Sequence, residues 1–272
     1  MPELLEGPLW LVGAGNMGGA MLRGWLAAGL DPAQATVIDP AARGLPEGIL
    51  TLPGPPPDGA APAVVVLAVK PQLLDVVAPA IAPALEHETL LISILAGIEI
   101  ASLRRRFTRP RGIVRVMPNT PVSIGKGVMA LHGDGLSADA AALAERLTAP
   151  LGLVEWIERE DQFDAVTALS GCGPAFLFRF IDAMAEAGAA LGLSADQAAR
   201  LAVATVEGAA LLAAGSNESP AQLADRVASP GGSTREGLNV LDENAAIRDL
   251  LARTLAAAAR RNAEMAAAAR EG

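Results

Sequence analysis

The fold of this chain is decided by residues 9–18, LWLVGAGNMG. Four apolar residues predict a buried strand, and the G-x-G-x-x-G that follows opens a helix pattern over 16–28. In that context the first glycine allows a tight turn, the second lets the backbone approach a pyrophosphate, and the third lets helix and strand pack closely. The stretch predicts a dinucleotide site, with a plain strand–helix turn as the alternative, and its expected binding residues are Gly13, Gly15, Asn16, Met17 and Gly18.

Strands and helices alternate outward from this motif to about residue 159. Short apolar runs predict further strands at 35–38, 64–69, 90–95, 113–116 and 153–157. This alternation is typical of an α/β doubly wound sheet, a Rossmann-type domain over residues 1–159. From about residue 161 the period is helical, which predicts an all-α domain over residues 160–272. Capping boxes are expected to start three of its helices, at Ser194, Ser219 and Ser233.

Composition restricts the class of protein. With 51% hydrophobic residues among 272, the chain is long and apolar enough for two folded domains. A net charge of −9 argues against a nucleic-acid partner. The arginines of residues 104–111 are interpreted as a solvated helix end, with a phosphate contact as the alternative. A mean hydropathy of +0.36, largely from alanine in the C-terminal half, predicts an oligomer interface there.

Other sequence features bear on location and metal binding. A single cysteine, Cys172, permits no intrachain disulfide and fits a reducing cytoplasm. The acidic N-terminus does not resemble a signal peptide, and no run of 18 apolar residues predicts a membrane span. Two histidines and one cysteine give no metal-ligand spacing, so no metal site is expected.

Residues after the second, third and fifth predicted strands extend the cofactor site. Asp39 is placed to accept hydrogen bonds from a ribose and to repel a 2′-phosphate, although it could instead start a turn with Pro40 and Arg43 could offset its charge. NADH and NADPH therefore both remain open. Lys70 is expected to contact a ribose, the nicotinamide or the substrate, unless it is simply a solvated lysine. The expected cofactor contacts here are Asp39, Ala68, Val69, Lys70, Pro71 and Asn119, the last beside the nicotinamide.

Residues 229–236, SPGGSTRE, form a glycine-rich loop that runs into a helix start. Unpaired N–H groups at a helix start bind anions, so the loop predicts a site for a small carboxylate. Two hydroxyls, on Ser233 and Thr234, lie at this point. Ser233 is interpreted mainly as a helix cap in a box with Glu236. The expected substrate contacts of this loop are Gly231, Gly232, Ser233 and Thr234.

A second glycine-rich segment opens the helical half. In SGCGP, residues 170–174, the two glycines let backbone approach either a ligand or the first domain. Cys172 has no histidine in a plausible partner position, so it is interpreted as a small apolar residue and not as a nucleophile. The expected substrate contacts are Ser170, Gly171, Cys172 and Gly173.

Taken together, these blocks resemble the pyrroline-5-carboxylate reductase family over nearly the whole chain. The blocks are the glycine loop with its Asn-Met, and residues 68–71 (AVKP), 93–97 (SILAG), 115–121 (RVMPNTP), 168–175 (ALSGCGPA) and 229–232 (SPGG). The chain departs from the family's usual serine at Cys172 and from its common threonine at Ser233. The first change removes a hydroxyl that contacts substrate in the family's pattern; neither change removes a backbone donor.

The resemblance implies a specific activity. Members transfer hydride from NADPH or NADH to the C=N bond of 1-pyrroline-5-carboxylate, which gives L-proline in the last step of proline biosynthesis. By resemblance Thr234 is a catalytic residue whose hydroxyl meets the ring nitrogen, and Lys70 is a second candidate. The family also implies a Rossmann domain, a helical dimerisation domain, a homodimer that in several members assembles into a homodecamer, and a cytoplasmic enzyme.

Two other functions stay open on the sequence. One is a related imine or 2-hydroxyacid reductase, although the helix from Pro174 lacks the lysine that hydroxyacid members usually carry there. The other is a non-catalytic dinucleotide-sensing protein, although the complete 229–236 loop favours an enzyme.

Overall fold

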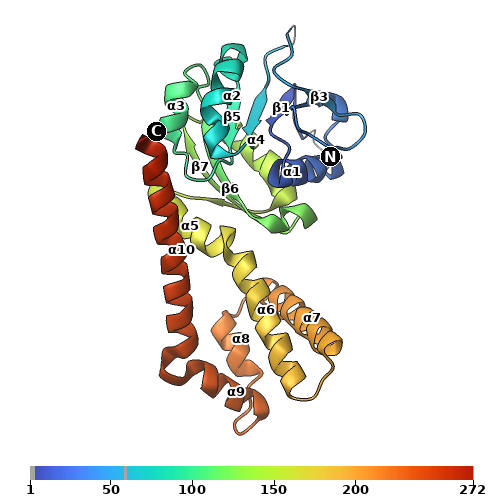
Figure 1. Ribbon diagram of the computed structural model, residues 1–272, viewed down its shortest axis with the longest axis vertical. Helices are drawn as coiled ribbons and strands as arrows, with labels where there is room; N and C mark the ends of the chain where they lie inside the picture. The colour runs from blue at the N-terminus through green and yellow to red at the C-terminus, as the bar shows by residue number, and fades with distance from the viewer. Residues whose placement is uncertain (1–3, 58–59, 272) are drawn as a thin grey trace. The chain divides into compact units, whose positions relative to one another are not determined.

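The computed structural model describes residues 4–57 and 60–271, with backbone alone for 268–271. By packing it divides into two units, Met1–Cys172 with Ala258–Gly272 (unit 1) and Gly173–Ala257 (unit 2). The sequence predicted a domain boundary between residues 159 and 160. That boundary stays a prediction, because these units are defined by packing alone. Figure 1 draws the elements of each unit.

Unit 1 contains an eight-stranded sheet in the order β3-β2-β1-β4-β5-β6-β7-β8. Neighbouring strands are parallel except for β6 and β7, which are antiparallel. The order reverses at β1, between β2 and β4, and this switch point is where such sheets bind dinucleotides. The predicted doubly wound α/β class is confirmed. The strands are β1 Leu9–Val12, β2 Ala35–Ile38, β3 Leu50–Leu52, β4 Val64–Leu67, β5 Leu90–Ser93, β6 Ile113–Pro118, β7 Gly127–Asp134 and β8 Gly152–Trp156.

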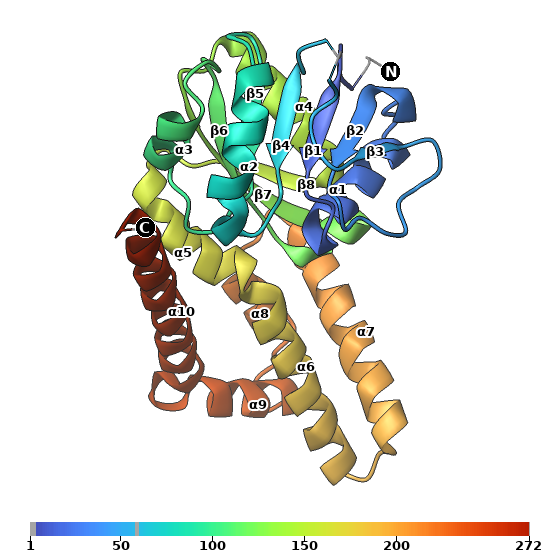
Figure 2. The same cartoon turned by 45° about the horizontal axis from the view of Figure 1, so that its top comes forward.

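Helices cover both faces of this sheet (Figure 2). Alternate strand residues face opposite sides, so Leu9 and Leu11 pack with α1 and α4, whereas Trp10 and Val12 pack with α2 and α3. The central strands are buried at every position, as parallel strands covered on both faces must be. The helices are α1 Asn16–Ala27, α2 Leu74–Ile81, α3 Ile100–Arg106, α4 Ala138–Thr148 and α5 Phe163–Val166.

The segment after residue 159 is bound to the sheet through a partly buried ion pair. Arg115 on β6 contacts Glu160 at 3.1 Å, and its guanidinium lies 4.4 Å from the ring centroid of Phe163. The same Glu160 oxygen accepts from the N–H of Ile100 at the start of α3. These contacts explain why the residues between 160 and 172 pack with unit 1, although their period is helical.

Unit 2 is entirely helical. Ser194 and Ser219 cap α7 and α8 as predicted, and at Ser219 the reciprocal bond of the capping box, with Gln222, is also present. Between α9 and α10 the chain turns through two residues with positive φ, Asn244 and Ala245. The helices are α6 Gly173–Ala190, α7 Ala195–Ala214, α8 Pro220–Arg226, α9 Ser233–Asp242 and α10 Ala246–Glu271, and the end of α10 lies in unit 1.

Candidate functional site

The glycine loop after β1 has the geometry that a dinucleotide site needs. Gly13 has φ +93°, and its N–H donates to the Ile38 carbonyl at 3.0 Å. A Cβ at Gly13 would lie 2.8 Å from the carbonyl carbon of Ala68, and one at Gly18 would overlap the Gly13 carbonyl oxygen. Side chains at these two positions would therefore force the loop away from the strand ends.

Gly15 is different, because an added Cβ would meet nothing within 4 Å. It is the N-cap of α1 and provides no side-chain cap. The first turn of α1 consequently has unpaired N–H groups beside open space, which is the arrangement that binds a phosphate. Asn16 is exposed at this turn, whereas Met17 packs against the core on the α1 face.

Asp39 holds the glycine loop in place. One carboxylate oxygen accepts from the N–H of Ala14 at 2.9 Å, and the other accepts from the N–H of Ala41 at 2.8 Å. Asp39 therefore does start a turn, which was the alternative interpretation, and it braces the loop as well. Arg43 is directed to the Ala42 carbonyl, at 2.7 Å.

A cavity of about 620 Å³ opens at the switch point between β2, β1 and β4. It brings together the glycine loop, Asp39 and Lys70, as the sequence predicted for the cofactor. Lys70 is exposed after β4, and its ammonium group makes no hydrogen bond or ion pair with the described residues. Pro71, next to it, starts a short 3-10 turn and does not line the cavity. The remaining wall includes Ala68, Val69, Pro53, Gly54, Pro55, Leu73 and Val76.

This cavity and loop fit a dinucleotide. The closed packing at Gly13 and Gly18 and the open space at Gly15 leave a cradle for a pyrophosphate at the start of α1. Most of the other wall residues are apolar, as suits the faces of a base and a ribose.

Asn119 and the Ser170 segment lie together in unit 1. The Asn119 amide nitrogen donates to the Ser170 carbonyl at 3.0 Å, and its oxygen accepts from the Val128 N–H at 2.8 Å. Ser170 lies in a π-helical turn, Thr167–Gly171, across which the N–H of Cys172 donates to the Thr167 carbonyl at 2.8 Å. π-Helical turns are frequent at functional sites. This turn was not predicted from the sequence. Pro174 was a signal for it, because proline has no N–H to donate to the carbonyl of residue 170.

The thiol of Cys172 is free and half-buried. Within the described residues, no group of three His, Cys, Asp or Glu side chains is arranged to hold a metal ion.

The 229–236 loop, described within unit 2, corrects one prediction. Gly231 has φ +71°, and helix α9 begins at Ser233 with Gly232 as its N-cap. Ser233 is therefore the first helical residue and not the cap, and no side chain caps this helix. The first intrahelical bond runs from the Glu236 N–H to the Gly232 carbonyl at 3.2 Å. The predicted box of Ser233 with Glu236 is wrong, and the N–H groups of the first turn are left for another acceptor.

Thr234 is exposed in this first turn. Arg235, beside it, is held by an ion pair with Asp225 at 2.8 Å, which connects α9 to α8. The loop thus keeps the hydroxyl of Thr234 and the backbone donors on one short helix start.

The arginines of residues 104–111 are largely occupied by the protein itself. Arg104 pairs with Asp134 at 2.9 Å and also donates to three backbone carbonyls. Arg106 pairs with Asp75 at 2.6 Å, and Arg109 donates to the Pro83 carbonyl at 2.7 Å. These bonds favour a structural role at the end of α3 over a phosphate contact.

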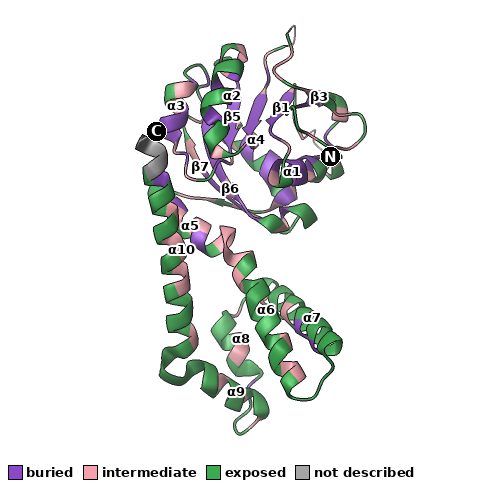
Figure 3. Cartoon of the chain, in the orientation of Figure 1, coloured by how far each residue is buried: buried purple, intermediate pink, exposed green. Residues whose placement is uncertain are grey.

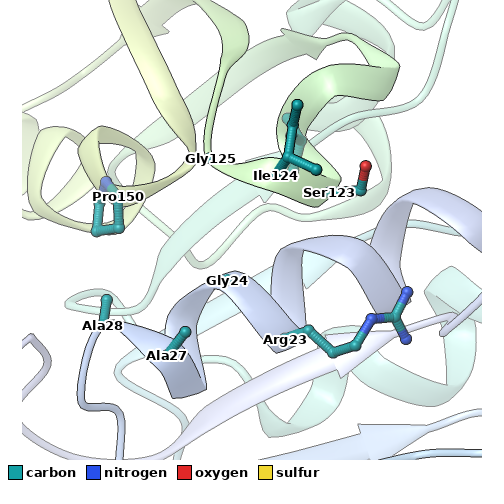
Figure 4. Close-up of a pocket in the computed structure, with 9 residues that line it drawn as sticks. Arg23, Gly24, Ala27, Ala28, Ser123, Ile124, Gly125 and Pro150 are labelled. Atoms are coloured by element: carbon teal, nitrogen blue, oxygen red, sulfur yellow. The ribbon is translucent and has the colours of Figure 1, made fainter.

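A second cavity, of about 490 Å³, lies between α1 and the turn Thr120–Ile124. Figure 4 shows Arg23 extending along α1 away from Pro150. Ser123 already donates to the Thr120 carbonyl. Arg23 and Ser123 carry the polar side chains of its wall, and the Ser123 hydroxyl is already bound, so this cavity offers no catalytic arrangement.

One described helix, α7, is long and apolar enough to cross a membrane by length and composition alone, and 11% of its apolar 18-residue stretch is buried. No run of 18 apolar residues predicted it, because Arg200 and Glu207 lie within the helix. A single helix of this kind is weak evidence for a membrane segment, since α7 also packs along α6.

Comparison with known proteins bears on both units. Residues 160–265 match the family model for pyrroline-5-carboxylate reductase dimerisation, and residues 9–97 match that for NADP oxidoreductase, coenzyme F420-dependent. The pyrroline-5-carboxylate reductase of Pseudomonas aeruginosa is 41% identical over 261 residues, which covers 94% of this chain and 95% of that one. The Glycine max enzyme is 38% identical with the same coverage.

Solved structures agree with these matches. A pyrroline-5-carboxylate reductase from Coxiella burnetii has a TM-score of 0.88 at 34% identity, covering 95% of this chain and 98% of that one. The Plasmodium falciparum pyrroline carboxylate reductase with NADP bound has a TM-score of 0.83 at 28% identity, covering 96% and 98%.

Proposed function

The chain belongs to the pyrroline-5-carboxylate reductase family, and on that premise we propose that it reduces 1-pyrroline-5-carboxylate to L-proline with NADH or NADPH. The observation that carries the proposal is 41% identity over 94% of the chain, together with an intact glycine loop at the switch point of the sheet. The activity is an oxidoreduction of the CH–NH class, the final step of proline biosynthesis.

Unit 1 holds the cofactor in this proposal. The first turn of α1 binds the pyrophosphate, while Gly13 and Gly18 keep the loop against the strand ends. Lys70 and the backbone of Ala68, Val69 and Pro71 lie after β4, where a ribose or the nicotinamide would be contacted. When bound, the reduced nicotinamide supplies a hydride to the ring C=N.

The helix start of α9 binds the substrate carboxylate. The first-turn N–H groups next to Gly232 have no side-chain cap to accept, so a carboxylate can take those bonds. A hydrogen bond to a charged group contributes about 1.5–3 kcal/mol, and the helix dipole adds about 0.3–1 kcal/mol. Thr234 then presents its hydroxyl to the ring nitrogen, as donor or proton relay. Holding the ring in one orientation is the main catalytic contribution of these residues.

The helical unit forms the subunit interface. α6 has no buried residue. The side chains of Phe178 on α6 and Leu211 on α7 are 64% and 59% exposed. Figure 3 shows α6, α8 and α9 with no buried residues, while α7 has a few. A second copy of the chain that covers these side chains gives a homodimer, and such dimers assemble into a homodecamer. Covering by protein also accounts for the apolar α7 without a membrane, in a cytoplasmic enzyme.

The first experiment follows NAD(P)H absorbance during incubation of the purified protein with pyrroline-5-carboxylate. The proposal predicts cofactor oxidation with formation of proline. Tight cofactor binding without turnover would favour a dinucleotide-sensing protein, and turnover only with another ring imine or with a 2-oxoacid would favour a related reductase.

The second experiment replaces the proposed donor. Thr234→Ala should lower kcat by about 100-fold, the lower range for a general acid–base group, whereas Thr234→Ser should keep most of it. Thr254→Ala is the control, because that hydroxyl donates only to the Leu250 carbonyl of its own helix. Unchanged turnover in Thr234→Ala with an intact fold would remove the catalytic role of Thr234.

A further inference from the structure

Asn119 is a buried polar side chain whose two ends are both bound to main chain. It is 7% exposed, at the end of β6. Its nitrogen donates to the Ser170 carbonyl at 3.0 Å, and its oxygen accepts from the Val128 N–H at 2.8 Å. The amide therefore ties the end of β6 to the start of β7 and to the π-helical turn.

The Ser170 carbonyl needs this bond because of Pro174. In an unbroken α-helix the carbonyl of residue 170 accepts from the N–H of residue 174. Proline has no N–H, so the partly buried Ser170 carbonyl would be left without its helical partner. Asn119, distant in sequence, supplies the missing donor.

The same contacts hold a break in the helix at the carboxyl end of β6. Because the N–H of Cys172 donates five residues back, to Thr167, the helix widens before α6 begins at Gly173. A Cβ on Gly171 would lie 3.3 Å from Thr167 Cγ2 and 3.9 Å from Met117 Cε, so the turn lies close against β6. The carboxyl ends of the parallel strands form the ligand edge of the sheet.

We propose that Asn119 is a positioning residue, which fixes the Ser170–Cys172 backbone at this edge so that the segment can hold the ring acid. It acts through the Ser170 carbonyl and not on the cofactor, since its amide is bound to main chain at both ends and Asn119 does not line the switch-point cavity. The inference rests on the proposed function and deepens it, because it assigns the helix break to substrate binding.

The test begins with Asn119→Asp, which keeps an oxygen for the Val128 N–H and removes the donor to Ser170. KM for pyrroline-5-carboxylate should rise about tenfold, the effect of losing one good hydrogen bond. The Kd for NADH, measured by fluorescence without substrate, should change by less than about twofold, because the glycine loop is untouched.

A second pair of variants separates positioning from stability. Pro174→Ala restores an N–H that can donate to the Ser170 carbonyl, so the melting temperature of Asn119→Ala should recover in the double variant. KM should remain raised in the double variant, because the new bond continues the α-helix and removes the break. The double variant also keeps the test usable if Asn119→Ala alone does not fold.

Asn262→Ala is the matched control, since that amide also donates to a carbonyl of the same helical segment, Asp164, at 3.4 Å. It should leave KM unchanged. A lower melting temperature with wild-type KM in Asn119→Asp would overturn the proposal in favour of a purely structural role. A Kd for NADH that rises with KM would overturn it in favour of direct cofactor binding. Absence of wild-type turnover would instead defeat the proposed function, and this inference with it.

Discussion

The two packing units bury their apolar residues to very different degrees. In unit 1 the strands β1, β2, β4 and β5 are buried at every position, and helices complete a core on each face. In unit 2 the buried residues are three alanines, Ala198, Ala202 and Ala228. Unit 2 nonetheless carries many large apolar side chains, so the difference lies in what covers them.

The two units therefore differ in what stabilises them. The cofactor half contains its own core, so its stability should not depend on protein concentration. The helical half lacks one, and its apolar surface needs a second copy to exclude water. A substitution in one unit should therefore leave the properties of the other unit unchanged.

The largest effect should come from a charge on the apolar surface of unit 2. Leu211→Glu on α7 removes a leucine that the second copy is expected to bury in each subunit. Each is worth about 1.5–3 kcal/mol, so the dimer Kd should rise at least about 100-fold. Sedimentation velocity across a concentration series measures this.

Leu153→Glu on β8 is its matched control, because the two leucines are 59% and 63% exposed. It should leave the dimer intact. If Leu153→Glu raises the dimer Kd as much as Leu211→Glu does, the dimer interface is not confined to unit 2.

Next in size are substitutions in the glycine loop. Gly18→Ala should lower stability by about 1–3 kcal/mol, because the new methyl group overlaps the Gly13 carbonyl. Gly15→Ala should leave stability unchanged, since nothing lies near its Cβ, yet weaken NADH binding by at least about tenfold. Thermal unfolding and cofactor fluorescence distinguish the two. If Gly15→Ala dimerises normally, cofactor binding by unit 1 is independent of dimerisation by unit 2. Wild-type affinity of Gly15→Ala for NADH would contradict the proposed phosphate site.

A smaller effect is expected at Asp39. Asp39→Ser removes a negative charge from the ribose end of the cavity, so the ratio of kcat/KM for NADPH to that for NADH should rise about tenfold. Because Asp39 also braces Ala14, both values should fall somewhat. If NADPH use does not improve relative to NADH, Asp39 is not the residue that discriminates between them. The dimer should be unaffected.

The smallest effect concerns pH and unit 1 alone. The hydrogen bond from Arg106 holds the pKa of the Asp75 carboxyl below its ordinary 3.8. A lowered folded-state pKa stabilises the protein above the ordinary value, and that contribution disappears as pH falls through the folded-state pKa. The melting temperature of wild type should exceed that of Asp75→Asn slightly at neutral pH, and the gap should close below about pH 4. A gap independent of pH would show that charge is not its cause.

Much of the fold followed from local pattern. The runs at 9–12 and 35–38 were predicted to the residue, because continuous apolar strands between turns have few other interpretations. Two strands were missed. β3 is three residues long and has no buried residue. β7 contains glycine and histidine and depends on antiparallel pairing with β6, which no local pattern reveals.

The candidate site was predictable in part. The glycine loop, Asp39 and Lys70 were predicted by their places after strands, and they do line one cavity. The cap at Ser233 was wrong, because the turn at Gly231 and Gly232 begins the helix one residue earlier than the Ser-x-x-Glu pattern implies. The bond from Asn119 to the Ser170 carbonyl could not be foreseen, since it joins residues 51 positions apart.

The bare start of α9 has a consequence for engineering. Elsewhere the chain caps α4, α7 and α8 with Ser137, Ser194 and Ser219, so a thermostabilisation campaign would select Gly232 for replacement by aspartate or serine. Such a change contributes only a few tenths of a kcal/mol, because glycine is itself a tolerated cap. The new side chain would then compete, as an intramolecular inhibitor, for the donors that we propose bind the substrate carboxylate. The uncapped start of α9 is thus one that a designer should leave alone.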